Sequence, residues 1–219
     1  LSLVKLGQAN LIPAYMISLV SFIIFFFSLM QSNGILFDQE ELDRLIVLPL
    51  SIREIVYEKY AFLYLLNSVF AILLILPADL VWFGYGASLL ELLLYLLLMG
   101  FIPLLPLCLA SLLGLCVAYI ASKAPHKNLV AFLFSLLLLF GLATGSMWAM
   151  RAGLSAENVG LLLTKQLTSL YPPASLFFNP QHFWWSSLLW MFVSFALTGL
   201  FLRYLSRNYL KINQMITGM

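Results

Sequence analysis

The chain has 219 residues, of which 63% are hydrophobic and 9% are charged, and its net charge at pH 7 is +2. A soluble domain carries about 25% charged residues, and a water-soluble fold cannot hide this much apolar surface, so the composition excludes a soluble protein. It also shows no basic patch of the kind that binds nucleic acid. Instead, runs of about 18 or more nearly uncharged residues recur, which is typical of transmembrane segments.

Five segments are apolar and long enough to cross a bilayer, and in chain order they cover about 11–31, 60–83, 88–121, 128–150 and 186–206. A helix pairs all of its backbone groups internally, whereas an open sheet edge in lipid does not, and no alternating pattern indicates a barrel. We therefore predict an all-α fold, a polytopic membrane helix bundle, with a single transmembrane domain over 1–219.

The third span, 88–121, is longer than a bilayer requires. A straight helix of this length would reach about 50 Å, against a hydrocarbon core near 30 Å. It contains Gly100, Pro103 and Pro106, and a proline removes a backbone donor and clashes with the preceding turn. We predict one span with a kink or break near Gly100–Pro106, not two separate spans.

The most charged segment, 37–60, holds six of the nine acidic residues. Asp38 and Glu41 have the spacing of a helix N-terminus, where acidic side chains suit the helix dipole. Leu42, Leu45, Ile46 and Leu48 then form an apolar stripe, and Pro49 ends the helix. We predict a short amphipathic helix over about 38–49 that lies along the membrane surface.

This helix is net negative, whereas helices that bind the anionic inner leaflet are rich in Lys and Arg. Lipid should repel it, so we expect a protein partner, with a solvated acidic loop as the alternative. The candidate interface residues are Asp38, Glu41, Leu42, Leu45, Leu48 and Pro49.

A second helix begins just after the proline. Ser51 and Glu54 form the S-x-x-E pattern of a capping box, so we expect this helix to start there and to continue into the second span. Tyr57 and Tyr60 would then lie at the inner interface with Lys59 beside them.

The basic residues predict the orientation, because segments rich in Lys and Arg face the cytoplasm. Eight of the eleven fall in three segments that would share one side, namely Arg44, Arg53, Lys59, Lys123, Lys127, Arg203, Arg207 and Lys211. We therefore predict a cell-membrane protein whose segment 38–49 and C-terminus are cytoplasmic. The aromatic and proline-rich segment 151–185 would face outside, either as interfacial or re-entrant helices or as a structured loop on the bilayer.

Two other function classes have some support. A secondary ion-coupled transporter needs ionisable residues near the bilayer midplane, but Asp79 and Glu91 lie close to an outer end. An intramembrane protease of the CAAX type has an E-E-x-x-x-R pattern, which Glu40 to Arg44 misses by one residue. The chain offers no convergent set of metal ligands or acid–base groups, so we predict neither a catalytic nor a metal site. Cys108 and Cys116 lie in an apolar run and are expected to be small packing residues.

One motif resembles a known family. The string LDRLIVLPLSIREIVYEK, from Leu42 to Lys59, is similar to the D-x-L-x-x-L-P-[IL]-S…[EK]-I…K segment of bacterial ABC exporter permeases, the membrane subunits of type-two ATP-binding-cassette exporters. The third span, with Pro103 and Pro106, also resembles their fourth helix. The resemblance implies six helices in the complete domain. The five spans here would match helices two to six, so the chain would be part of a longer polypeptide.

The resemblance further implies that 38–49 is the coupling helix, which contacts a separate ATPase subunit. The chain has no G-x-x-x-x-G-K-[ST] phosphate loop, so the partner would bind the ATP. We therefore expect a transport subunit without a cofactor of its own and not an enzyme. It would pair with a second permease half or form a homodimer, in contact with membrane lipid. The lack of charge at midplane favours an amphipathic, lipid-like or hydrophobic peptide cargo.

Overall fold

The computed structural model describes residues 9–36, 51–122, 136, 172–177 and 182–217. Its elements are η1 (Ala9–Leu11), α2 (Ile12–Leu36), α4 (Ile52–Gly84), α5 (Leu89–Met99), α6 (Leu104–Ser122), η3 (Pro172–Phe177) and α9 (Phe183–Thr217). All of these elements are helical, and together they form a bundle, which confirms the predicted all-α fold.

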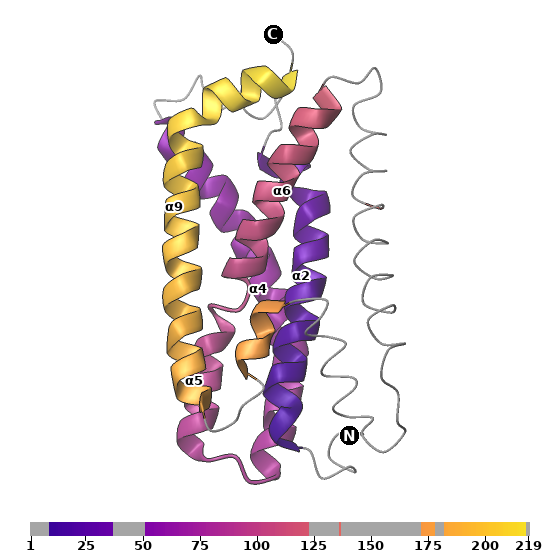
Figure 1. Ribbon diagram of the computed structural model, residues 1–219, viewed down its shortest axis with the longest axis vertical. Helices are drawn as coiled ribbons and strands as arrows, with labels where there is room; N and C mark the ends of the chain where they lie inside the picture. The colour runs from indigo at the N-terminus through magenta and orange to yellow at the C-terminus, as the bar shows by residue number, and fades with distance from the viewer. Residues whose placement is uncertain (1–8, 37–50, 123–135, 137–171, 178–181, 218–219) are drawn as a thin grey trace.

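The long helices run side by side along one axis (Figure 1). α2 packs against both α4 and α6, and α9 packs against α6 and α4. Four helical stretches in the described part of the chain are long and apolar enough to cross a membrane: Ala9–Gln31, Ile52–Gly84, Leu89–Val117 and Phe183–Ile212. They correspond to the first, second, third and fifth predicted spans. The other predicted span, 128–150, lies outside the described residues.

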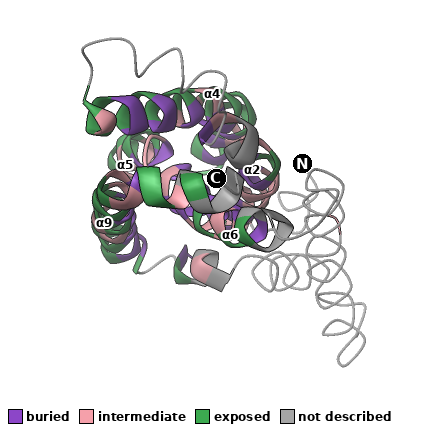
Figure 2. Ribbon diagram, turned by 90° about the horizontal axis from the view of Figure 1, so that it is seen from above, coloured by how far each residue is buried: buried purple, intermediate pink, exposed green. Residues whose placement is uncertain are grey.

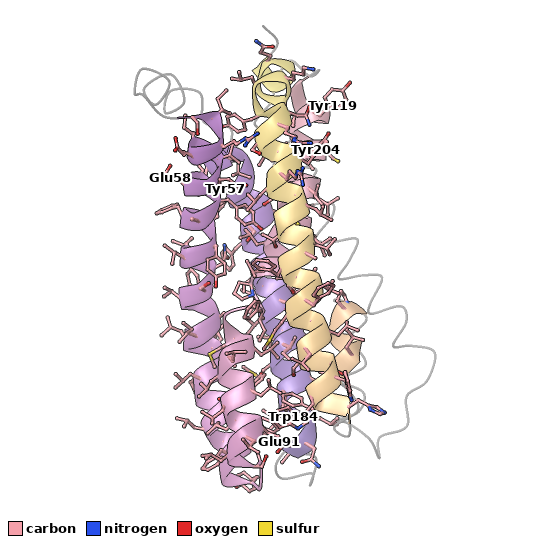
Figure 3. All side chains as sticks on the ribbon, turned by 90° about the vertical axis from the view of Figure 1, so that its left-hand side faces the viewer. Tyr57, Glu58, Glu91, Tyr119, Trp184 and Tyr204 are labelled. Carbon is pink, nitrogen blue, oxygen red and sulfur yellow. The ribbon has the colours of Figure 1, made fainter. Side chains whose placement is uncertain are left out.

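Exposed tyrosine and tryptophan side chains gather near the two ends of the bundle. Figure 3 labels Tyr57 and Tyr204 near the upper end and Trp184 near the lower end. On α9, Trp185 and Tyr204 are 74% and 57% exposed, and the helix between them rises about 28 Å. That distance matches a hydrocarbon core of about 30 Å, with the aromatic rings at the headgroup levels.

Between these two levels, as far as Leu202 on α9, the exposed side chains are apolar. On α9 they are Leu188, Leu189, Phe192, Phe195, Leu197 and Leu200. Figure 2 shows the exposed faces of α4 and α9 turned away from the bundle axis and the buried faces turned toward it. In water such an outer surface would be a large exposed apolar patch. Around a membrane-spanning bundle it is the surface that contacts lipid.

The predicted bend in the third span is present. α5 ends at Met99 and α6 begins at Leu104, and the two continue from the lower to the upper end as one broken span (Figure 1). Pro103 has no N–H to donate to the carbonyl of Met99, and its ring would clash with that carbonyl in a continuous helix. The short connection therefore replaces one turn of helix.

The break releases a carbonyl that a neighbouring helix satisfies. Tyr64 on α4 donates its hydroxyl to the carbonyl oxygen of Gly100 at 2.8 Å. In lipid, backbone groups freed by a proline must find such a partner, because no water is available. Gly100 has φ −68° and ψ −25°, which any residue adopts, so its conformation does not require glycine.

Part of the predicted outer segment, 151–185, is described. η3 is a short 3-10 helix that packs between α2 and α9, and Figure 1 draws it in orange, set back from the lower end of the bundle. Phe177, the last residue of η3, is 2% exposed. Ser186 of α9 donates to the carbonyl oxygen of Leu176 at 2.6 Å, which ties η3 to the start of α9.

We predict that Tyr64→Phe lowers the free energy of unfolding by about 1–2 kcal/mol, because it leaves the Gly100 carbonyl without its donor and changes nothing else. Unfolding by SDS in mixed micelles, followed by circular dichroism, measures this.

Gly100→Ala is the control. Its Cβ would lie 3.7 Å from the Leu97 carbonyl oxygen and 3.8 Å from the Tyr64 hydroxyl, which are ordinary contacts. We expect it to leave the stability nearly unchanged. A larger loss in Gly100→Ala than in Tyr64→Phe would show that glycine, and not the tyrosine bond, maintains the break.

Candidate functional site

The predicted coupling segment lies between the ends of α2 and α4. Its candidate interface residues, Asp38, Glu41, Leu42, Leu45, Leu48 and Pro49, are outside the described residues and stay a prediction. The structure does describe where the chain leaves the bundle, at Leu36, and where it returns, at Ser51. Both points lie at the upper end in Figure 1.

The return point is a complete capping box, as the sequence predicts. The Ser51 hydroxyl accepts from the backbone N–H of Glu54 at 3.4 Å, and the Ser51 N–H donates to the Glu54 carboxylate at 2.7 Å. This pairing satisfies two of the N–H groups that a helix start leaves open. The first turn of α4 is therefore fixed where the segment rejoins the bundle.

The exit point is held by side chains from two other helices. Lys59 of α4 donates its ammonium group to the carbonyl oxygen of Ile35 at 3.2 Å. The hydroxyl of Tyr209, from α9, donates to the carbonyl oxygen of Leu36. We call these four residues the α2 clasp.

The clasp supplies hydrogen-bond donors to the last carbonyl groups of α2. The last carbonyls of a helix have no partner within it, and the C-terminus carries a partial negative charge that a cation stabilises. Lys59 supplies both a donor and a positive charge, and it is only 2% exposed. Tyr209 reaches the same place because the last turns of α9 cross over the upper end of the bundle (Figures 1 and 2).

An apolar cluster surrounds the clasp and joins α2, α4, α6 and α9. Its buried members are Leu36, Ile55, Val56, Tyr60, Leu63, Leu107, Cys108, Phe201, Leu205 and Tyr209. The rings of Tyr60 and Phe201 are 5.9 Å apart. Close packing of this kind transmits displacement, because the interior has few voids. The end of α2 therefore cannot move without its neighbours.

The sequence-based placement of Lys59 and Tyr60 needs correction. Tyr57 is 46% exposed near the upper end, as expected for an interface residue, but Tyr60 is 3% exposed and packs inside the bundle. Lys59 is buried rather than extended toward the headgroups, because the carbonyl of Ile35 gives it a partner inside the bundle. Tyr209 was not expected at all. It lies 173 residues from Leu36, and no local pattern marks it.

The described lysines and arginines all lie at the upper end, whereas the described acids lie at both ends, with Glu54 and Glu58 at the upper one. The described basic residues are Arg53, Lys59, Arg203, Arg207 and Lys211, and all of them belong to the upper part of α4 and α9. Asp79 and Glu91 lie toward the lower end, where Figure 3 labels Glu91. Among residues 9–36, 51–122, 172–177 and 182–217, that end carries no lysine or arginine.

The two cysteines and the other potential metal ligands are spread over the described part of the chain. No group of three His, Cys, Asp or Glu side chains in the described ranges could hold a metal ion. Cys108 is buried, Cys116 is exposed, and both are free thiols. The thiol of Cys108 lies 3.8 Å from the carbonyl oxygen of Leu197 on α9, so it packs between α6 and α9.

We predict that Tyr209→Phe costs about 1–3 kcal/mol of unfolding free energy, since it removes the donor to the Leu36 carbonyl and keeps the ring. The control is Tyr204→Phe, which removes a hydroxyl that is exposed on the same helix and should cost close to nothing. The measurement is SDS unfolding in mixed micelles. Equal stability of the two variants would mean that the clasp does not hold the end of α2.

Comparison of the chain with protein-family models, with curated proteins and with solved structures finds no match. The resemblance to exporter permeases therefore rests on the motif from Leu42 to Lys59 and on the layout of the spans.

Proposed function

We propose that the chain is the membrane-spanning permease subunit of an ATP-driven ABC exporter, coupled through 38–49 to a separate ATPase subunit. The α2 clasp is the observation that supports this most. A partner that pushes on a cytoplasmic segment can move the transmembrane helices only if the ends of that segment are firmly connected to them. Here the segment begins at a helix end bonded to α4 and α9, and it ends at a capped helix start.

The length of α4 would let a movement at the upper end reach the other side of the membrane. α4 is one helix of 33 residues, about 50 Å long, with Pro77 inside its last turns. A displacement of the segment 38–49 would move the ends of α2 and α4 together, and the clasp would carry it to α9. The break between α5 and α6 supplies a place where the bundle can bend.

The predicted interface has the chemistry of a protein contact. Leu42, Leu45 and Leu48 would be the apolar anchors that dominate binding energy at such interfaces. The acidic residues Asp38 and Glu41 would meet basic groups at the rim, where charges adjust encounter rate and specificity. The ATPase subunit would supply nucleotide binding and hydrolysis.

We place the clasp end of the bundle in the cytoplasm. The support is the distribution of the described basic residues, since lysine and arginine are enriched on the cytoplasmic side of membrane proteins. The exposed Arg203, Arg207 and Lys211 recur every four residues on α9, so they share one helix face. That face would contact the anionic headgroups of the inner leaflet.

A secondary ion-coupled transporter is the second candidate, and one observation favours it. Asp79 of α4 is 2% exposed, and its Oδ1 has no hydrogen-bond partner among the described residues. Ionisable side chains in spans commonly mark ion pathways. Transport that follows an ion gradient and continues without ATP would favour this candidate over the exporter.

The orientation predicts a labelling pattern. In a variant with both native cysteines replaced by alanine, Tyr85→Cys should react with a membrane-impermeant thiol reagent in intact cells, whereas Arg207→Cys should react only after permeabilisation. Tyr85 is 59% exposed at the lower turn and Arg207 is exposed near the upper end. Labelling of position 207 alone in intact cells would reverse the orientation.

The coupling helix predicts an ordered set of defects. Leu45→Asp should weaken binding of the ATPase subunit by about 2 kcal/mol or more, because it places a charge at a central apolar anchor. Glu40→Gln should cost only about 0–1 kcal/mol, as for an exposed charge. Pro49→Ala should permit binding but abolish transport, because the helix would continue past its corner.

These variants are compared by the ATP hydrolysis that co-purifies with the tagged chain from native membranes and by transport in vesicles. The pure chain should hydrolyse ATP at background rate, since it has no phosphate loop. If Leu45→Asp retains both co-purifying hydrolysis and transport, the segment is a solvated loop and the exporter proposal loses its main support.

A further inference from the structure

A recessed cavity of about 160 Å³ lies at the end of the bundle opposite to the α2 clasp. It is formed by η1, the first turns of α2, α5 and α9, the end of α4 with the turn that follows it, and η3. The lining residues that matter are Asn10, Trp82, Glu91, Phe177 and Phe183. Its volume corresponds to roughly five water molecules at ~30 Å³ each, which suits a small ligand group and not a large molecule.

Three of the lining side chains are aromatic and almost fully buried. Trp82, Phe177 and Phe183 are 6%, 2% and 4% exposed. The ring centroids of Trp82 and Phe183 are 5.5 Å apart, and those of Phe177 and Phe183 are 6.1 Å apart. Tyr95 packs behind them, 5.7 Å from Trp82. One side of the cavity is thus a connected aromatic cluster, and aromatic rings attract cations through their faces.

The same place carries two carboxyl groups, and that of Glu91 accepts hydrogen bonds from the backbone N–H and the hydroxyl of Ser88. Glu91 lines the cavity, and Asp79 lies one turn deeper on the face of α4 that carries Trp82. The buried Oδ1 of Asp79 has no hydrogen-bond partner among the described residues. No lysine or arginine in the described ranges lies at this end. A buried charge without a partner is unfavourable, so a bound cation would stabilise this region.

We infer that this cavity binds an organic ammonium group. The aromatic walls favour an alkylated ammonium over a hydrated metal ion, and Glu91 and Asp79 supply the opposite charge. The group could belong to a free cation or to a lipid headgroup, which present the same chemistry. The site goes beyond the exporter proposal and does not depend on it, because binding requires neither the segment 38–49 nor an ATPase.

The test compares choline with its neutral isostere 3,3-dimethylbutan-1-ol, which has the same shape without the charge. The 219-residue chain is placed in nanodiscs of phosphatidylglycerol, a lipid without an ammonium group, and both probes are titrated by saturation-transfer NMR. We expect choline to bind at least tenfold more tightly than the isostere. Equal affinities, or no binding of choline, would overturn the inference.

Substitutions in and beside the cavity, compared with matched substitutions elsewhere, test whether choline binds at this site. Asp79→Asn should weaken choline binding tenfold or more, and Trp82→Leu should weaken it at least threefold. Glu91→Gln should also weaken it at least threefold, and glutamine can still complete the capping box with Ser88, so the helix start is kept. The controls are Glu58→Gln and Trp185→Leu, which remove an exposed acid at the other end and an exposed ring.

The controls should leave choline affinity unchanged. If Glu58→Gln weakened binding as much as Asp79→Asn, the effect would be one of overall charge and the site would be refuted.

Nanodiscs of phosphatidylcholine distinguish a free cation from a lipid headgroup as the source of the ammonium group. Weaker binding of free choline there identifies the lipid headgroup as the competing ligand, whereas unchanged binding identifies a free cation, and either result supports the ammonium site.

Discussion

A backbone carbonyl at a helix end has few partners in or near a bilayer, and this chain satisfies such carbonyls with side chains from neighbouring helices. Tyr64 bonds to Gly100 at the break between α5 and α6. Lys59 and Tyr209 bond to the last carbonyls of α2. Each bond joins two helices, so the groups that satisfy the backbone also fix how the helices pack. Between helices in lipid, hydrogen bonds and close packing replace the hydrophobic effect.

The upper end of the bundle is tightly packed, whereas the lower end contains a cavity, and the two ends would suit different roles. The upper end has buried donors, basic residues and a tight apolar cluster around the clasp. The lower end has a cavity, buried rings and two carboxylates. A rigid end suits the transmission of force from a partner, whereas a cavity with charge and aromatic walls suits recognition of a ligand. α9 and α4 belong to both ends.

Local chemistry made much of the fold predictable. The proline at 103 predicts the break, and the Ser51 and Glu54 pair predicts the start of α4. The same S-x-x-E pattern at Ser88 and Glu91 forms a second capping box at the start of α5, which the sequence would also have supported. These features depend on residues a few positions apart, which is why a single sequence is sufficient to find them.

The clasp and the cavity could not be found in this way. Tyr209 contacts Leu36 only because α9 crosses the upper end of the bundle. Trp82 contacts Phe183 only because α4 ends, and α9 begins, at the lower end of the bundle. Asp79 was expected close to an outer end of its span. It lies toward the lower end of the bundle, and its burial depends on the elements packed around it. The interface residues of 38–49 lie outside the described part and stay predictions from sequence.

α4 connects the two ends through its buried face, which carries three polar residues at different depths. Lys59 bonds to α2, and Asn67 donates to the carbonyl oxygen of Leu63 at 2.8 Å. Of these three residues, only Asp79 has a buried oxygen without a hydrogen-bond partner in the described part of the chain. Asp79 lies toward the cavity end of α4, and the other end of this helix follows the segment 38–49. A movement of α4 driven from the clasp would shift Asp79 and Trp82 together, and so would change the affinity of the cavity for a cation.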